Sequence, residues 1–160
     1  MIRKVEDRDV PVIADIYNGY ISNSVASFEI KPLTEEEMRG RIFSISSHFP
    51  YIVEEEDGKV VGFAYAHLWK DRASYRKSLE TTVYIHPDYQ HKGIGTRLML
   101  QLIEECRTAG YHVLIACITG SNKQSCRLHE KLGFHQVSLF KEVGEKFGKR
   151  LDVVDYELIL

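Results

Sequence analysis

A short turn with two glycines, in the second half of the chain, has the composition of a phosphate-binding site. It reads Gln90-His91-Lys92-Gly93-Ile94-Gly95 and stands between a strand pattern and an amphipathic helix pattern. Glycine lets a backbone approach a ligand closely, and the first N–H groups of a helix are unpaired and lie at the positive end of its dipole. The turn is therefore a candidate site for a pyrophosphate. The alternative is a tight strand-to-helix connection that binds nothing.

Spacing separates this turn from two other phosphate-binding motifs. The chain has no GxxxxGK[ST] run, and the dinucleotide fingerprint GxGxxG would require glycine where Leu98 stands.

Cys106, Cys117 and Cys126 fit neither a disulfide framework nor a zinc pattern, and the seven histidines form no HExxH pair. We therefore expect no metal site. Cys117 lies in an apolar run and is expected in the core.

The elements that must position this turn alternate between strand and helix patterns. Thr34-Glu35-Glu36-Glu37 is a capping box that opens a helix, and Asp57-Gly58 is a hairpin turn. Predicted strands cover residues 2–5, 51–53, 60–66, 79–85, 112–118, 137–143 and 153–160. Predicted helices begin at Asp9–Pro11, after Thr34 (apolar positions Met38, Ile42, Phe43 and Ile45), after Gly95 and at Asn122, where the helix runs to Leu132. The pattern predicts a single α/β or α+β domain over residues 1–160, with a central mixed sheet and helices on both faces.

Composition argues against two classes of partner. The 21 basic and 23 acidic residues give a net charge of −2, so a nucleic-acid partner is not expected. No run approaches 18 apolar residues, and no membrane partner is expected. The segment Met1–Asp7 turns acidic before any apolar stretch, which does not fit a signal peptide. We expect a cytoplasmic protein.

Two motifs in a fixed order resemble those of the GNAT superfamily of N-acetyltransferases. Gln90-xx-Gly93-x-Gly95 after a strand is similar to the superfamily's acyl-CoA motif. Asn122-xx-Ser125-xx-Leu128-His129-xxx-Gly133-Phe134 is similar to its next motif. Over nearly its whole length the chain resembles the phosphinothricin and methionine sulfoximine N-acetyltransferase branch of this superfamily. The residues that carry this resemblance are Ile16-Tyr17-Asn18, Ser27-Phe28-Glu29, Trp69-Lys70, Tyr75, Glu80, Val83-Tyr84 and Leu128-His129. The resemblance implies a mostly antiparallel sheet.

The resemblance implies acetyl-CoA as the cofactor. Its pantetheine arm would bond to the backbone of Val83, Tyr84 and Ile85 as an added strand does. Asn122 would cap its helix and contact the same arm, although capping alone would explain this residue. The pyrophosphate would lie on the turn and the helix start, at His91, Lys92, Gly93, Ile94, Gly95 and Thr96.

The resemblance also implies roles for two titratable residues. Glu80 would take the proton of the acceptor amine, directly or through a water. The superfamily has a tyrosine at the place of His129, and the branch shares the histidine, which would either protonate the leaving thiolate or hydrogen-bond the acceptor. Residue type alone would make Glu80 an ion-paired surface residue and His129 a polar residue on an exposed helix face.

The acceptor implied by the branch is the primary amine of a small amino acid analogue. Lys70, Asp71 and Arg72, together with Glu80 and His129, would bind it, the basic groups pairing with a carboxylate or phosphinate. A solvated charged loop is the alternative for the first three. The branch's last hairpin helps form a homodimer, and many relatives have tryptophan where Arg150 stands. Two other functions stay open: acetylation of another amine, such as an amino acid, polyamine or drug, and a non-catalytic sensor of acyl-CoA.

Overall fold

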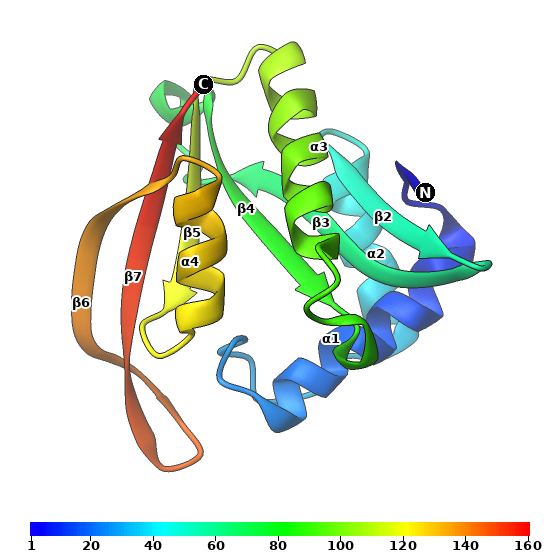
Figure 1. Cartoon of the computed structure of the whole chain (residues 1–160), viewed down its shortest axis with the longest axis horizontal. Coiled ribbons are helices and arrows are strands. Elements are labelled where there is room, and N and C mark those ends of the chain that lie inside the picture. The colour runs from blue at the N-terminus through cyan, green and yellow to red at the C-terminus, as the bar shows by residue number, and fades with distance from the viewer.

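Seven strands form one sheet in the order β1-β2-β3-β4-β5-β7-β6. The computed structural model describes residues 1–160 (Figure 1). The strands are β1 (Ile2–Lys4), β2 (Tyr51–Glu56), β3 (Lys59–Leu68), β4 (Ser78–Ile85), β5 (Val113–Thr119), β6 (His135–Lys146) and β7 (Lys149–Ile159). The α-helices are α1 (Val10–Asn23), α2 (Glu35–Ser46), α3 (Ile94–Thr108) and α4 (Lys123–Lys131). The predicted mixed sheet with helices on both faces is confirmed.

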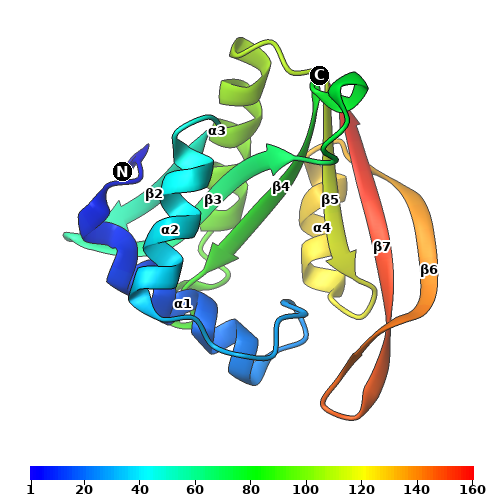
Figure 2. The same cartoon turned by 180° about the vertical axis from the view of Figure 1, so that it is seen from behind.

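The helices divide between the two faces of the sheet. In Figure 1, α3 and α4 lie in front of the strands, and the reverse view in Figure 2 shows α1 and α2 over the other face. Each face has its own apolar core. Leu98, Met99 and Leu102 of α3 are fully buried on one side, whereas Ile13 of α1 packs with Phe63 of β3 on the other. None of the four α-helices has the length and apolar character needed to span a bilayer.

The local signals read from the sequence hold in the structure. Thr34 accepts a hydrogen bond from the Glu37 N–H at 3.1 Å, and the Glu37 side chain returns to the Thr34 backbone, so the capping box is formed. Asp57 and Gly58 have φ angles of 49° and 77°. Positive φ at both central residues is what a type I′ hairpin turn requires, and β2 and β3 pair on either side of this turn.

Two predictions about packing and length are wrong. Phe43 was expected on the buried face of its helix but is 73% exposed, because α2 rests on the sheet through Met38 and Ile42. The last two strands are also longer than the predicted 137–143 and 153–160. Polar residues dominate their ends, and an irregular pairing between Phe140 and Gly144 interrupts the strand pattern in β6.

The centre of the sheet contains its only parallel pair. β4 pairs with β5 over three residues only, from Ser78–Val113 to Glu80–Ile115, whereas all other neighbours are antiparallel. Beyond Glu80 the two strands diverge, as Figure 1 shows. The β5-facing backbone groups of β4 therefore have no strand partner from Thr81 onward. This gap is where the candidate site lies.

Candidate active site

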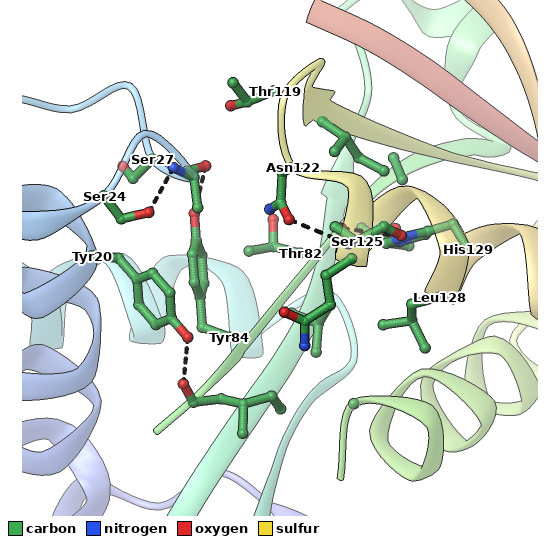
Figure 3. A pocket seen from close by; sticks show the side chains of 18 of the residues that line it. Tyr20, Ser24, Ser27, Thr82, Tyr84, Thr119, Asn122, Ser125, Leu128 and His129 are labelled. Atoms are coloured by element: carbon green, nitrogen blue, oxygen red, sulfur yellow. Dashed lines mark hydrogen bonds between the residues drawn. The ribbon is translucent and has the colours of Figure 1, made fainter. Parts of the chain in front are cut away.

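A cleft of about 1170 Å³ opens where β4 and β5 diverge. Its walls come from both strands, from the start of α3, from α4 and from the segment after α1. In Figure 3, Tyr20 and Tyr84 lie on one side of the cleft and Asn122, Ser125 and His129 on the other. Pockets for small molecules have about this size.

The glycine turn enters the cleft at the start of α3. Gly93 is the N-cap residue with φ 76°, a left-handed conformation that favours glycine, and His91 is left-handed as well. The Tyr20 hydroxyl donates a hydrogen bond to the Ile85 carbonyl at 2.5 Å and accepts one from Gln90 Nε2 at 2.9 Å. The first residue of the motif thus ties the turn to α1 and to the end of β4.

Gly95 has a packing role that the sequence analysis did not include. A Cβ at this position would lie 3.3 Å from Leu128 Cδ2 of α4. The small residue therefore permits close contact between α3 and α4, and this contact alone accounts for it. Gly93 is different, because its left-handed backbone is the feature that shapes the turn.

Asn122 and His129 lie on the α4 wall. The Asn122 side-chain oxygen accepts a hydrogen bond from Ser125 N at 3.2 Å, so the predicted cap is formed and the amide nitrogen remains available to a ligand. His129 lines the cleft although it is only 3% exposed, and its ring meets the Phe134 ring edge-on at 5.1 Å. The alternative from residue type alone, a polar residue on an exposed helix face, does not hold for His129.

The tautomer of His129 follows from its hydrogen bond. Nδ1 lies 2.7 Å from the Ser125 carbonyl oxygen, which can only accept, so Nδ1 carries the proton. Burial lowers the pKa of the imidazole, with a partly opposing effect from the Ser125 hydrogen bond. The ring is therefore neutral near pH 7, and Nε2 is left as a proton and hydrogen-bond acceptor.

Glu80 lies in the floor of the cleft beside His67. The two residues are register partners on β4 and β3, and His67 Nε2 is 3.7 Å from the Glu80 carboxylate. Burial raises the pKa of Glu80; His67 opposes the shift and Asp155 adds to it. A carboxylate with a raised pKa is a stronger base. The sequence analysis missed His67, because only the strand register brings it to Glu80.

The structure separates the other predicted residues into two groups. Lys70, Asp71 and Arg72 lie on the exposed connection between β3 and β4 and do not line the cleft. The Lys70 ammonium lies over the Trp69 ring. Lys92 is also outside the lining. The remaining predicted cofactor-binding residues do line it: Val83, Tyr84, Ile85, His91, Gly93, Ile94, Gly95, Thr96 and Asn122.

Cys117 and the segment Ser24–Phe28 also line the cleft. Cys117 is exposed and lines the cleft, so its expected place in the core is wrong; on β5, Ala116 and Ile118 are the buried neighbours that point to the core. The segment Ser24–Phe28 forms another wall. It belongs to no helix or strand. The resemblance at Ser27-Phe28-Glu29 offers Phe28 as a wall of the acceptor pocket, with a core role as the alternative. No group of three or more His, Cys, Asp or Glu side chains is arranged to hold a metal ion.

Comparison with known proteins identifies the family. Residues 13–134 match the Acetyltransferase (GNAT) family. The chain belongs to this family. It is an N-acetyltransferase that uses acetyl-CoA, and the resemblance inferred from the two motifs is confirmed.

Individual relatives cover nearly the whole chain. A phosphinothricin N-acetyltransferase from Alcaligenes faecalis is 41% identical over 155 residues, which are 96% of this chain and 79% of the relative. An L-methionine sulfoximine/L-methionine sulfone acetyltransferase from Salmonella typhimurium is 34% identical over 99% of this chain and 94% of the relative. One similar structure is the crystal structure of a GNAT superfamily phosphinothricin acetyltransferase from Sinorhizobium meliloti in complex with acetyl-CoA. It superposes with a TM-score of 0.97 and 35% identity, and the match covers 100% of this chain and 88% of that chain.

The cleft of this chain fits acetyl-CoA. A long thioester with a pyrophosphate needs an extended groove and a turn with free N–H groups, and the divergent strands and the left-handed Gly93 turn offer both.

Proposed function

We propose that this acetyltransferase acetylates the primary amine of a small amino acid analogue, with phosphinothricin, methionine sulfoximine and methionine sulfone as the first candidates. The names of the relatives support this acceptor class. The observation that carries the proposal is the position of Glu80, a partly buried carboxylate in the floor of the cleft between β4 and β5.

Glu80 is the proposed base for direct transfer. Acetyl-CoA supplies the acetyl group as a thioester, and the acceptor must lose its ammonium proton before it can attack. The Glu80 carboxylate accepts this proton directly or through one water. The nitrogen would then bond to the acetyl carbon as the carbon–sulfur bond breaks, and the second proton lost by the nitrogen would go to the leaving thiolate. His67, 3.7 Å away, opposes the effect of burial on the pKa of Glu80 and so favours the ionised carboxylate.

His129 acts in this proposal as a hydrogen-bond acceptor. Its Nδ1 proton is donated to the Ser125 carbonyl, so a neutral ring has no proton on Nε2 to donate. The geometry therefore favours hydrogen bonding to the acceptor or to the thiol over general acid catalysis. The free amide nitrogen of Asn122, on the same wall, would donate to the pantetheine arm.

The backbone of β4 is the proposed source of polar contacts to the thioester. From Thr81 to Ile85 this strand bonds to β3 on one side only. N–H groups on the open side can bond to an extended pantetheine and to the acetyl carbonyl oxygen. These contacts require Val83, Tyr84 and Ile85 to be extended, as they are, and do not depend on their side chains.

Lys70 and Arg72 are the proposed partners for the acidic groups of the acceptor. The connection that holds them begins after Leu68, one residue beyond His67, so it starts at the end of the strands where Glu80 lies. Trp69 and Tyr75 pack edge to face at 5.3 Å and give this connection a fixed base. Neither cation lines the cleft, so the connection would have to move for either one to reach the acceptor.

The proposal includes a homodimer in the cytoplasm, where acetyl-CoA is available. β6 is an edge strand, and apolar residues along its hairpin are more than half exposed: Val137, Leu139, Phe140, Val143 and Phe147. An exposed apolar edge is a template for pairing with another chain. A second copy of this chain, with the same edge, is the proposed partner.

Thiol release from acetyl-CoA tests the proposal. Wild-type protein should release thiol with at least one of L-phosphinothricin, methionine sulfoximine and methionine sulfone. Glu80→Gln should reduce turnover by roughly 100-fold, whereas Glu36→Gln, at an exposed position on α2, should not. Turnover that survives Glu80→Gln would exclude the base. Binding of acetyl-CoA without turnover on any amine in a wider screen would instead indicate an acyl-CoA sensor.

A further inference from the structure

The segment Ser24–Phe28 forms one wall of the cleft but is irregular in structure. In both overall views, the loop after α1 extends toward the hairpin of β6 and β7. Within the segment, Ala26 N donates to Ser24 Oγ at 2.9 Å. A segment without regular structure needs partners elsewhere for its other backbone groups, so the rest of the chain must determine its shape.

Side chains from three strands supply those partners. Each donates to backbone carbonyl oxygens of the segment, and the three come from parts of the sheet on either side of the cleft. The bonds are Thr119 Oγ1 to Val25 O at 2.7 Å, Tyr84 hydroxyl to Ala26 O at 3.5 Å, and Lys146 Nζ to Ser24 O at 2.7 Å and Ser27 O at 2.6 Å.

Lys146 makes the strongest of these contacts. Its side chain is only 4% exposed, and burial of an ammonium group is unfavourable unless hydrogen bonds replace the lost water. Two short bonds, to the carbonyls of Ser24 and Ser27, do this. Burial also lowers the pKa of Lys146, an effect that Glu29 partly opposes. Lys146 does not line the cleft, so it acts on the segment and not on a ligand.

A second contact joins the hairpin to the segment close to Lys146. The Phe28 ring lies against Gly144, where a Cβ atom would come within 2.4 Å of ring atom Cε2. The φ angle of Gly144 is not positive, so its backbone would accept alanine and only the ring would have to move. The hairpin therefore holds the segment by an ammonium group at one point and by a ring-to-backbone contact at another.

We infer that Lys146 is a positioning residue for the amine acceptor: it holds the Ser24–Phe28 segment in place as a wall of the cleft and so defines the space available to the acceptor. The inference rests on the proposed function for the identity of the acceptor, but not for the contact itself. Because β6 also carries the proposed dimer edge, Lys146 links the outer edge of the sheet to the wall of the cleft formed by Ser24–Phe28.

Two measurements on Lys146→Met test the inference, with Lys149→Met, an exposed lysine on the same hairpin, as the control. Amide hydrogen exchange of residues 24–28 should become about tenfold faster in Lys146→Met and stay unchanged in Lys149→Met. The KM for the amine should rise about tenfold, with the KM for acetyl-CoA changed less than twofold. Exchange at the wild-type rate, or equal increases in both KM values, would overturn the inference.

Gly144→Ala provides a second test that keeps the charge. Displacement of the Phe28 ring should change the KM for the amine by about fivefold or more and leave the KM for acetyl-CoA unchanged. An unchanged KM for the amine would contradict the inference even if Lys146→Met failed to fold. If the wild-type protein acetylates none of the amines, the proposed function fails, and hydrogen exchange alone decides whether Lys146 holds the segment.

Discussion

Arg97, on the first turn of α3, forms an ion pair with Glu54, a buried residue of β2. Arg97 Nε donates to Glu54 Oε1 at 2.9 Å, and Nη1 of the same guanidinium donates to the Lys92 carbonyl at 3.0 Å. The other oxygen of Glu54 is buried without a hydrogen-bond partner. Glu54 therefore orients Arg97, and Arg97 fixes the carbonyl that precedes Gly93.

We predict that Arg97→Met weakens the binding of the pyrophosphate. Without the guanidinium the Lys92 carbonyl is free to rotate, and the N–H groups of the turn lose their common orientation. The KM for acetyl-CoA should rise about tenfold. S-acetylpantetheine lacks the pyrophosphate and serves as the control: its KM should be the same for both proteins, and a parallel increase would contradict the prediction.

Removal of the Arg97–Glu54 ion pair should also make the protein less stable. Arg97→Met leaves the Glu54 carboxylate buried and unpaired. Because Arg97 itself is half exposed, the free energy of unfolding should fall by about 1–3 kcal/mol. Glu54→Gln combined with Arg97→Met removes the stranded charge and should recover at least half of this loss. Urea unfolding followed by circular dichroism measures both. A double variant less stable than Arg97→Met would show that the carboxylate is not the cause.

The pH dependence of turnover should report Glu80. A base must be deprotonated, so kcat/KM should fall as pH falls through the pKa of Glu80, which burial raises above that of an ordinary glutamate. His67 lowers this pKa, so His67→Gln should move the acidic limb to higher pH. An acidic limb at the same pH in wild-type and His67→Gln proteins would argue that another group titrates.

We predict that the protein forms its dimer through the exposed edge of β6. Leu139→Glu should convert a dimer into a monomer, because a carboxylate would be buried at an interface where Leu139 is now 54% exposed. Phe43→Ser, at an exposed apolar position on α2, is the matched control and should leave the dimer intact. Light scattering coupled to size-exclusion chromatography gives both masses. A wild-type monomer at micromolar concentration would refute the dimer.

Local chemistry made much of the fold predictable. The capping box at Thr34 and the hairpin turn at Asp57-Gly58 act through neighbouring residues, and both are present in the structure. Burial is decided by distant packing, so apolar character alone placed Phe43 and Cys117 wrongly in the interior. In β6, an irregular pairing hides the strand from any pattern with a period of two.

The candidate site was predictable where a motif carried it. Glu80, Asn122, His129 and the turn at Gly93 all line the cleft. His67 and, apart from Phe28, the segment held by Lys146 could not be found in this way, because strand register and contacts across more than 100 residues bring them there.

The sheet has two kinds of open strand edge. The edge at β6 lies on the outside and is accessible to any extended chain of suitable character. The edge along Thr81–Ile85 lies inside, between β4 and β5. The walls of the cleft surround this inner edge, and an extended, flexible arm can pair with it there. The fold thus keeps one unpaired strand edge inside the cleft, where it is less accessible to aggregation than an edge on the outside of the sheet.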